Sequence, residues 1–166
     1  YTAVVTPFDD GRIDTKSLRR VVEQQMDAGI HGIVACGTTG ESATLSDDEI
    51  LEVTQNILSV SAGHCKVIAG VGTNNTNHTV ELVKRVQGLG VDGALVITPY
   101  YNKPSQRGLL SHFQTVAAAA DDLPIMLYTV PGRTGVHLNI DTFDELRSVP
   151  NIVSLKDATA DLALSA

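Results

Sequence analysis

Short runs of apolar, mostly β-branched residues alternate with amphipathic segments along the chain, and this alternation constrains the fold more than any other feature. The runs are continuous rather than alternately polar, as expected for parallel strands that are covered on both faces. A strand followed by a helix, repeated with no linker or low-complexity tract between units, predicts successive βα units of one parallel sheet. The apolar runs lie at residues 2–6, 32–37, 66–72, 93–99, 124–130 and 151–156.

The segments between these runs carry helix start and stop signals. Asp14 stands before an amphipathic segment that ends at Gly29. Ser46 opens the next one with Glu49 three residues later, which is the pattern of a capping box. We expect three further helices within residues 74–90, 105–120 and 139–148.

A parallel βα chain closes either as a doubly wound open sheet or as a TIM-type barrel. The first strand-to-helix turn, residues 6–14, lacks the G-x-G-x-x-G fingerprint of a dinucleotide-binding sheet. Residues 70–75 (GVGTNN) come nearest, but they lack the third glycine and follow the third strand. The sequence therefore favours the (β/α)8 barrel.

The length of the chain sets how much of a barrel it can form. Eight βα units take about 250 residues, whereas this chain has 166. We expect residues 1–166 to be a single catalytic barrel domain that covers about the first five and a half βα units, ending within a sixth helix. We expect it to be truncated at both ends, with most of the loss C-terminal.

Composition narrows the classes of partner. Nineteen acidic residues against twelve basic ones give a formal net charge of -7. This balance argues against nucleic acid or an anionic membrane as a partner, because phosphate binding needs clustered Lys and Arg. No apolar run approaches the roughly 18 residues of a membrane span.

The cysteines and histidines indicate neither a disulfide framework nor a metal site. Cys36 and Cys65 stand singly in apolar surroundings, so we read both as small core residues of a reduced, cytoplasmic protein. The five histidines form neither an H-x-x-x-H nor an H-E-x-x-H pattern. We therefore predict no metal ligands.

Polar residues that could take part in catalysis collect where the predicted strands end. These positions are the segments CGTTGE (36–41), TPYYNKP (98–104), YTVPGRTG (128–135) and LKDA (155–158). In a barrel, the carboxyl ends of the strands form the functional face. We expect the side chains at these four ends to share one face.

Lys156 ends a buried-looking strand, although lysine is almost never fully buried without a partner. Tyr128 lies one βα repeat upstream, so the two should occupy equivalent positions on adjacent strands about 4.8 Å apart. An amine that is removed from water among hydroxyls is held more readily in its neutral, nucleophilic form. A solvated strand end is the simpler interpretation for Lys156 alone, but the other strand ends favour a nucleophilic lysine.

The segments GTTGE, PYYNKP, YTVPGRTG and LKDA, in this order and spacing, resemble the signature of the dihydrodipicolinate synthase family. This family belongs to the wider group of pyruvate-dependent class I aldolases and lyases. The resemblance covers essentially all of the chain. It implies a Schiff-base lyase that condenses pyruvate with L-aspartate 4-semialdehyde to 4-hydroxy-tetrahydrodipicolinate in lysine (diaminopimelate) biosynthesis.

The resemblance also implies a role for each matching residue. Lys156 is the lysine that forms an imine with pyruvate, so no separate cofactor is needed. Tyr128 relays protons near this imine, and Thr38 and Tyr101 are its hydrogen-bonded partners. Thr38 and Thr39 hold the pyruvate carboxylate.

Arg133 is the residue that the resemblance assigns to the carboxylate of the second substrate, aspartate semialdehyde. The tyrosine matched by Tyr101 comes from a neighbouring subunit in the family, which implies a homodimer or homotetramer.

Alternatives remain open at this point. The chain could be another pyruvate-dependent aldolase, such as an N-acetylneuraminate lyase or a keto-deoxy-sugar aldolase. The pair Thr38 and Thr39 favours the dihydrodipicolinate synthase family over these aldolases. It could also be a catalytically inert barrel fragment. Lysine-inhibited members of the family carry histidines at the positions of Asp47 and Ile50 and a glutamate at that of His78, so we expect weak or absent inhibition by lysine.

Overall fold

The computed structural model describes residues 1–160, and the chain forms two compact units. Unit 1 comprises residues 1–70 and 85–93, and unit 2 comprises residues 71–84 and the chain from residue 94 onward. The expectation of a single catalytic barrel domain stays a prediction. The expected sixth helix falls largely on residues outside the described part of the chain.

Unit 1 contains three parallel strands, which lie within the first three predicted runs. Thr2 pairs with Ile33, and Ile33 pairs with Val67 on the other side. The central strand is buried throughout, which explains its continuous apolar sequence. The strands, in spatial order, are β1 (Thr2–Ala3), β4 (Gly32–Ala35) and β5 (Lys66–Gly70).

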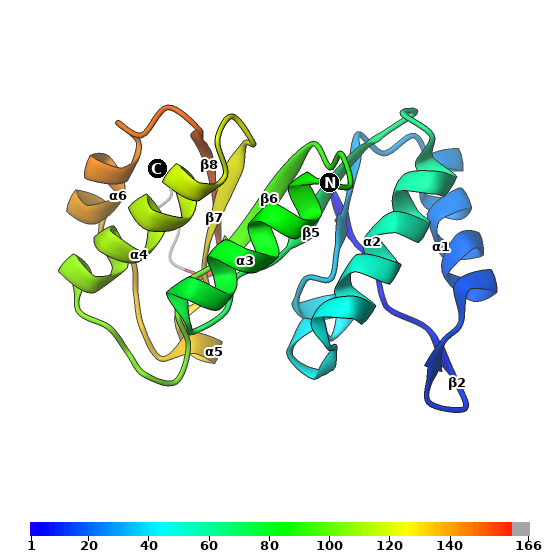
Figure 1. Cartoon of the computed structure of the whole chain (residues 1–166), viewed down its shortest axis with the longest axis horizontal. Coiled ribbons are helices and arrows are strands. Elements are labelled where there is room, and N and C mark those ends of the chain that lie inside the picture. The colour runs from blue at the N-terminus through cyan, green and yellow to red at the C-terminus, as the bar shows by residue number, and fades with distance from the viewer. Residues whose placement is uncertain (161–166) are drawn as a thin grey trace. The chain divides into compact units, whose positions relative to one another are not determined.

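Two helices of unit 1 begin where the capping signals predict. The carboxylate of Asp14 accepts a hydrogen bond from the backbone N–H of Ser17 at the start of α1 (Thr15–Asp27). Ser46 and Glu49 form the complete capping box of α2 (Asp47–Ser61). The two helices pack against each other and lie side by side in Figure 1.

A short antiparallel hairpin in unit 1 was not predicted. Strands β2 (Phe8–Asp9) and β3 (Arg12–Ile13) pair across a turn formed by Asp10 and Gly11. Both turn residues have positive φ angles, of 46° and 72°, as a type I′ turn requires. The Asp-Gly pair is a recognised hairpin signal, but the flanking sequence is too short and too polar to indicate strands.

Unit 2 contains three parallel strands, whose pairing brings two predicted site residues into register. Its strands are β6 (Gly93–Ile97), β7 (Ile125–Thr129) and β8 (Ile152–Asp157), in that spatial order. Tyr128 pairs with Ile97 on one side and with Lys156 on the other. The register between β7 and β8 shifts once, between Ile125 and Met126, which lies at the opposite end from Tyr128.

The helices of unit 2 match the predicted segments. Helix α3 (Thr76–Gln87) begins in this unit, and α4 (Gln106–Ala119) packs against α6 (Ile140–Leu146), as Figure 1 shows. Ser105 caps α4 by accepting from the backbone N–H of Gly108. Among residues 1–160 we find no helix with the length and apolar character that a bilayer span demands.

Both units contain large apolar side chains that are fully buried. Full burial of one large aliphatic or aromatic side chain contributes roughly 1.5–3 kcal/mol to the free energy of unfolding. These buried side chains therefore stabilise the strands whose ends carry the predicted site residues. The largest fully buried side chains include Leu18, Val22, Ile33, Val53, Ile57 and Val67 in unit 1, and Leu82, Leu109, Phe113, Ile125, Leu127 and Leu146 in unit 2.

Burial of His112 on α4 links the stability of unit 2 to pH. Its side chain is 4% exposed, and its Nδ1 lies 2.9 Å from the Thr76 hydroxyl oxygen. Burial lowers the pKa of His112 from 6.5 to about 4. The unfolded chain therefore takes up this proton at a higher pH than the folded chain does, and stability is lost as the pH falls from 6.5 through 4.

We expect His112→Asn to reduce this acid sensitivity. Urea unfolding at about pH 7 and about pH 4.5 should show a drop in unfolding free energy that is roughly 2–3 kcal/mol larger for the natural protein than for the variant. His31→Asn, at an exposed histidine, serves as the control and should behave like the natural protein. Equal drops in the natural protein and in His112→Asn would contradict the prediction.

Candidate functional site

Lys156 and Tyr128 lie together at the carboxyl ends of adjacent strands of unit 2. They are direct register partners in the parallel pair of β7 and β8. The Lys156 Nζ lies 4.3 Å from the centroid of the Tyr128 ring. Tyr128 is 6% exposed and Lys156 is half-buried, so the amine stands partly out of water against an aromatic face. The predicted placement of the two residues at equivalent positions of adjacent strands is confirmed.

The main chain after Lys156 is held by its own hydrogen bonds. The backbone N–H of Ala158 donates to the carbonyl of Thr129, which extends the ladder of β7 and β8 by one step. The Asp157 carboxylate accepts from the backbone N–H of Thr159 at 2.8 Å and from its hydroxyl at 3.1 Å. These contacts fix the strand end that carries the lysine.

Arg133 lies in a one-turn helix, α5 (Pro131–Thr134), immediately after β7. Proline fits the first helical position because it lacks an N–H to satisfy. The turn ends at Gly135, whose φ of 72° favours glycine. Arg133 is exposed, so its guanidinium can reach an incoming anion.

Tyr101 projects from the loop after β6. Its side chain is 89% exposed, and its φ of 72° is unusual for an aromatic residue. The backbone N–H of Tyr101 donates to the Thr134 carbonyl at 3.4 Å, and the Asn102 side chain donates to the Asn74 carbonyl at 3.0 Å. The loop is thus held in a conformation that costs energy, which is common at functional sites.

A buried pair of hydroxyls, which sequence analysis missed, lies beneath these loops. Thr98 and Thr134 are 0% and 2% exposed, and the Thr98 hydroxyl lies 3.3 Å from that of Thr134. The backbone N–H of Thr98 donates to the carbonyl of Tyr128 at 2.8 Å. Both threonines flank recognised motif residues, but nothing in the sequence indicates that their side chains meet.

Thr38 and Thr39 belong to unit 1. They begin a 3-10 turn, η1 (Thr38–Gly40), just after the carboxyl end of β4, and both are exposed. Gly40 packs against the segment that follows β1, because the Thr6 hydroxyl donates to the Gly40 carbonyl at 2.7 Å. A Cβ on Gly40 would lie 3.1 Å from the Val4 carbonyl oxygen, so this close approach favours glycine.

The cysteines are buried and free, as predicted. Burial raises the pKa of Cys36 to about 12, and its thiol approaches the Ile50 carbonyl. A thiol in this environment is a poor nucleophile, so Cys36 is a packing residue. Within residues 1–160, no group of three or more His, Cys, Asp or Glu side chains is placed to hold a metal ion.

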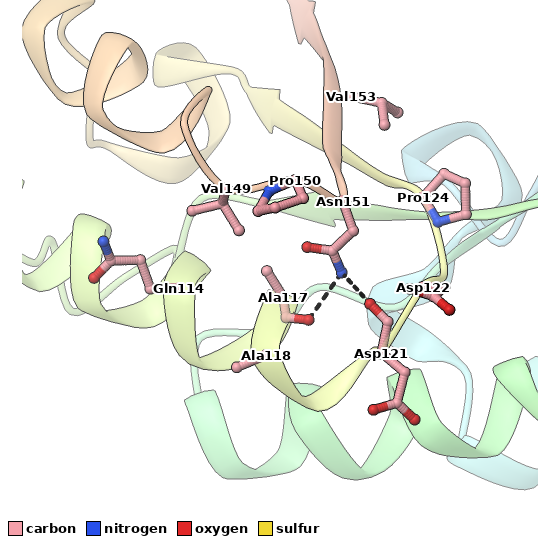
Figure 2. Close-up of a pocket in the computed structure, with 10 residues that line it drawn as sticks. All are labelled: Gln114, Ala117, Ala118, Asp121, Asp122, Pro124, Val149, Pro150, Asn151 and Val153. Carbon is pink, nitrogen blue, oxygen red and sulfur yellow. Dashed lines mark hydrogen bonds between the residues drawn. The ribbon is translucent and has the colours of Figure 1, made fainter.

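A cavity of about 420 Å³ lies at the other end of the unit 2 strands. Pro124 and Asn151 come just before β7 and β8, so the cavity opens at their amino ends and contains none of the predicted site residues. Figure 2 shows Asn151 at its centre, donating to the carbonyls of Ala117 and Asp121, both at 2.9 Å. In barrels the amino ends of the strands serve stability, and these bonds fasten α4 to the start of β8.

The class of protein that these features define is a parallel α/β protein. It has a lysine at the carboxyl end of one strand beside a tyrosine on the neighbouring strand. The model of the dihydrodipicolinate synthetase family matches residues 1–166. The chain therefore belongs to this family.

Individual relatives agree with this assignment. The 4-hydroxy-tetrahydrodipicolinate synthase of Magnetococcus marinus is 49% identical over 98% of the chain. The solved dihydrodipicolinate synthase of Aquifex aeolicus is 44% identical over 98% of the chain, with a TM-score of 0.96. That of Acinetobacter baumannii, solved in complex with pyruvate, is 48% identical over 98% of the chain, with a TM-score of 0.95.

The chain spans about half the length of these relatives. It covers 55% of the Magnetococcus marinus protein and 56% of each of the two solved chains. The predicted fold class, a TIM (β/α)8 barrel of which only the first units are covered, is confirmed, and so is the family resemblance.

Proposed function

We propose that the protein is a Schiff-base lyase that condenses pyruvate with L-aspartate 4-semialdehyde to 4-hydroxy-tetrahydrodipicolinate, a step of lysine biosynthesis. The observation that carries the proposal is the pairing of Lys156 with Tyr128 at adjacent strand ends, in a chain of this family. A relative solved with pyruvate supports the choice of first substrate.

The proposed chemistry begins at Lys156. Its neutral amine attacks the keto carbon of pyruvate, and loss of water leaves an imine. The protonated imine draws electrons from the methyl group, so a methyl proton leaves and an enamine forms. The enamine carbon attacks the aldehyde carbon of the second substrate. The amino group of that substrate then displaces Lys156 from the imine carbon, which closes the ring and frees the enzyme.

Protons must move at several of these steps, and Tyr128 is the proposed relay. Free tyrosine has a pKa of about 10 and is a weak acid or base alone. Hydroxyl partners at Thr38 and Tyr101 would form a chain through which a proton reaches solvent.

The two substrates both carry carboxylates, and we propose separate groups for them. The Thr38 and Thr39 hydroxyls and their backbone N–H groups bind the pyruvate carboxylate. The planar, bidentate guanidinium of Arg133 binds the carboxylate of aspartate semialdehyde. No external cofactor takes part, because the lysine itself supplies the electron sink.

We also propose an assembled, cytoplasmic enzyme. A side chain such as Tyr101, which is 89% exposed in the single chain, can serve the site of a neighbouring subunit. A homodimer or homotetramer would supply this contact. The net charge of -7 is consistent with a cytoplasmic protein that binds neither nucleic acid nor membrane.

A turnover assay on the protein at its natural length tests the proposal. Pyruvate with aspartate semialdehyde should give the cyclic product, while N-acetylneuraminate and keto-deoxy-sugar acids should not be cleaved. Cleavage of a sugar acid without consumption of aspartate semialdehyde would contradict the proposed second substrate.

Inhibition by lysine is expected to be weak or absent. In unit 1, the Asp47 carboxylate faces Arg85 at 3.5 Å, and Ile50 is 6% exposed and apolar, so neither position offers a histidine's nitrogen donors. Initial rates measured across a lysine titration, with a lysine-inhibited member of the family as the control, check this. Half-inhibition below about one millimolar would contradict it.

A further inference from the structure

The loops that carry Arg133 and Tyr101 are joined through one buried residue, Thr134. Its backbone carbonyl accepts from the N–H of Tyr101. Its hydroxyl oxygen lies 3.0 Å from the Val136 carbonyl and 3.4 Å from the Val136 N–H, so it closes the turn that contains Arg133. Arg133 itself is the preceding residue in the chain.

Thr98 connects this junction to the strand that carries Tyr128. Its hydroxyl can donate to that of Thr134, and its backbone N–H donates to the carbonyl of Tyr128. A hydroxyl provides one hydrogen and two lone pairs, so Thr134 can accept from Thr98 while donating to a turn carbonyl. The pair is fully buried, so water cannot replace a lost bond.

We propose that Thr98 and Thr134 are a positioning pair for the second-substrate step, acting through the main chain of Arg133. Neither residue is among the groups that we propose to contact the reacting atoms. The choice of aspartate semialdehyde as the affected substrate rests on the proposed function. The hydrogen bonds of the pair do not depend on it.

Loss of the pair should raise the KM for aspartate semialdehyde far more than the KM for pyruvate. Lys156 and Tyr128 are fixed chiefly by the ladder of β7 and β8, which does not depend on the two hydroxyls. Arg133 stands in a turn that the Thr134 hydroxyl closes through its contacts with Val136. Loss of the Thr134 hydroxyl therefore loosens the turn that contains Arg133 and leaves Lys156 in place.

The test compares Thr134→Val, which keeps the shape and removes the hydroxyl, with Thr134→Ser, which restores it. We expect the valine variant to raise the KM for aspartate semialdehyde roughly fivefold or more and to leave the KM for pyruvate within about twofold. The serine variant should recover most of the loss. Thr54→Val, which removes another fully buried hydroxyl on α2, controls for general destabilisation and should change neither KM.

Hydrogen exchange provides a readout that does not depend on turnover. In Thr134→Val, the amides of residues 99–104 and 130–137 should exchange faster, while those of residues 152–157 should not. If the natural protein fails to consume aspartate semialdehyde, the proposed function falls, and the exchange pattern alone decides the positioning inference. Equal rises in both KM values, failure of serine to rescue, or unchanged exchange in the two loops would overturn it.

Discussion

Lys156→Ala is expected to lower turnover by about 10³-fold or more, because the amine that we propose forms the imine is gone and no other residue is proposed for the covalent step. Lys156→Arg should fail equally: it keeps the positive charge, but a guanidinium does not form an imine with a ketone. Steady-state rates with both substrates, measured at natural chain length, check both variants.

The control for this experiment is Lys84→Ala, at an exposed lysine of α3. It removes one positive charge at a distance along the chain from the strand end, and it should retain full activity. Substantial turnover in Lys156→Ala, with normal folding by circular dichroism, would contradict the assignment of Lys156 as the nucleophile.

Tyr128→Phe is expected to lower kcat by roughly 10²- to 10³-fold, the range that general acid–base groups contribute. The ring that packs beside the Lys156 amine remains, so the imine should still form, though more slowly. Only the hydroxyl that we propose as the proton relay is lost. Single-turnover kinetics with pyruvate, followed by steady-state rates with both substrates, separate imine formation from the later steps.

Tyr1→Phe provides the matched control, since Tyr1 is an exposed tyrosine of unit 1 and its hydroxyl has no proposed role. A Tyr128→Phe variant with an unchanged kcat would contradict the proton relay, and it would leave Tyr128 as a packing partner of the lysine.

The sequence predicted the strands and helices well because their signals are local. The Asp14 cap and the capping box of Ser46 and Glu49 fixed the starts of α1 and α2. The one-repeat spacing of Tyr128 and Lys156 placed them in register, because equivalent positions of adjacent parallel strands lie side by side.

What the sequence could not provide depends on contacts between distant segments. The hydroxyl contact of Thr98 with Thr134, and the bond from Tyr101 to the Thr134 carbonyl, appear only when the loops after β6 and β7 meet. Asn151 reads as an ordinary loop residue, yet its side chain donates to three carbonyls around the C-terminal end of α4 and the loop that follows it. Buried polar contacts of this kind carry no periodic signal.

The most direct test of the central claim is borohydride trapping with pyruvate, followed by intact mass measurement and peptide mapping. The protein at its natural length, incubated with pyruvate and reductant, should gain one reduced pyruvyl group per chain, on Lys156. Omitting the reductant should leave no stable adduct. A folded protein that gains no adduct, or gains it on another lysine, would contradict the claim that Lys156 ends its strand in order to form an imine.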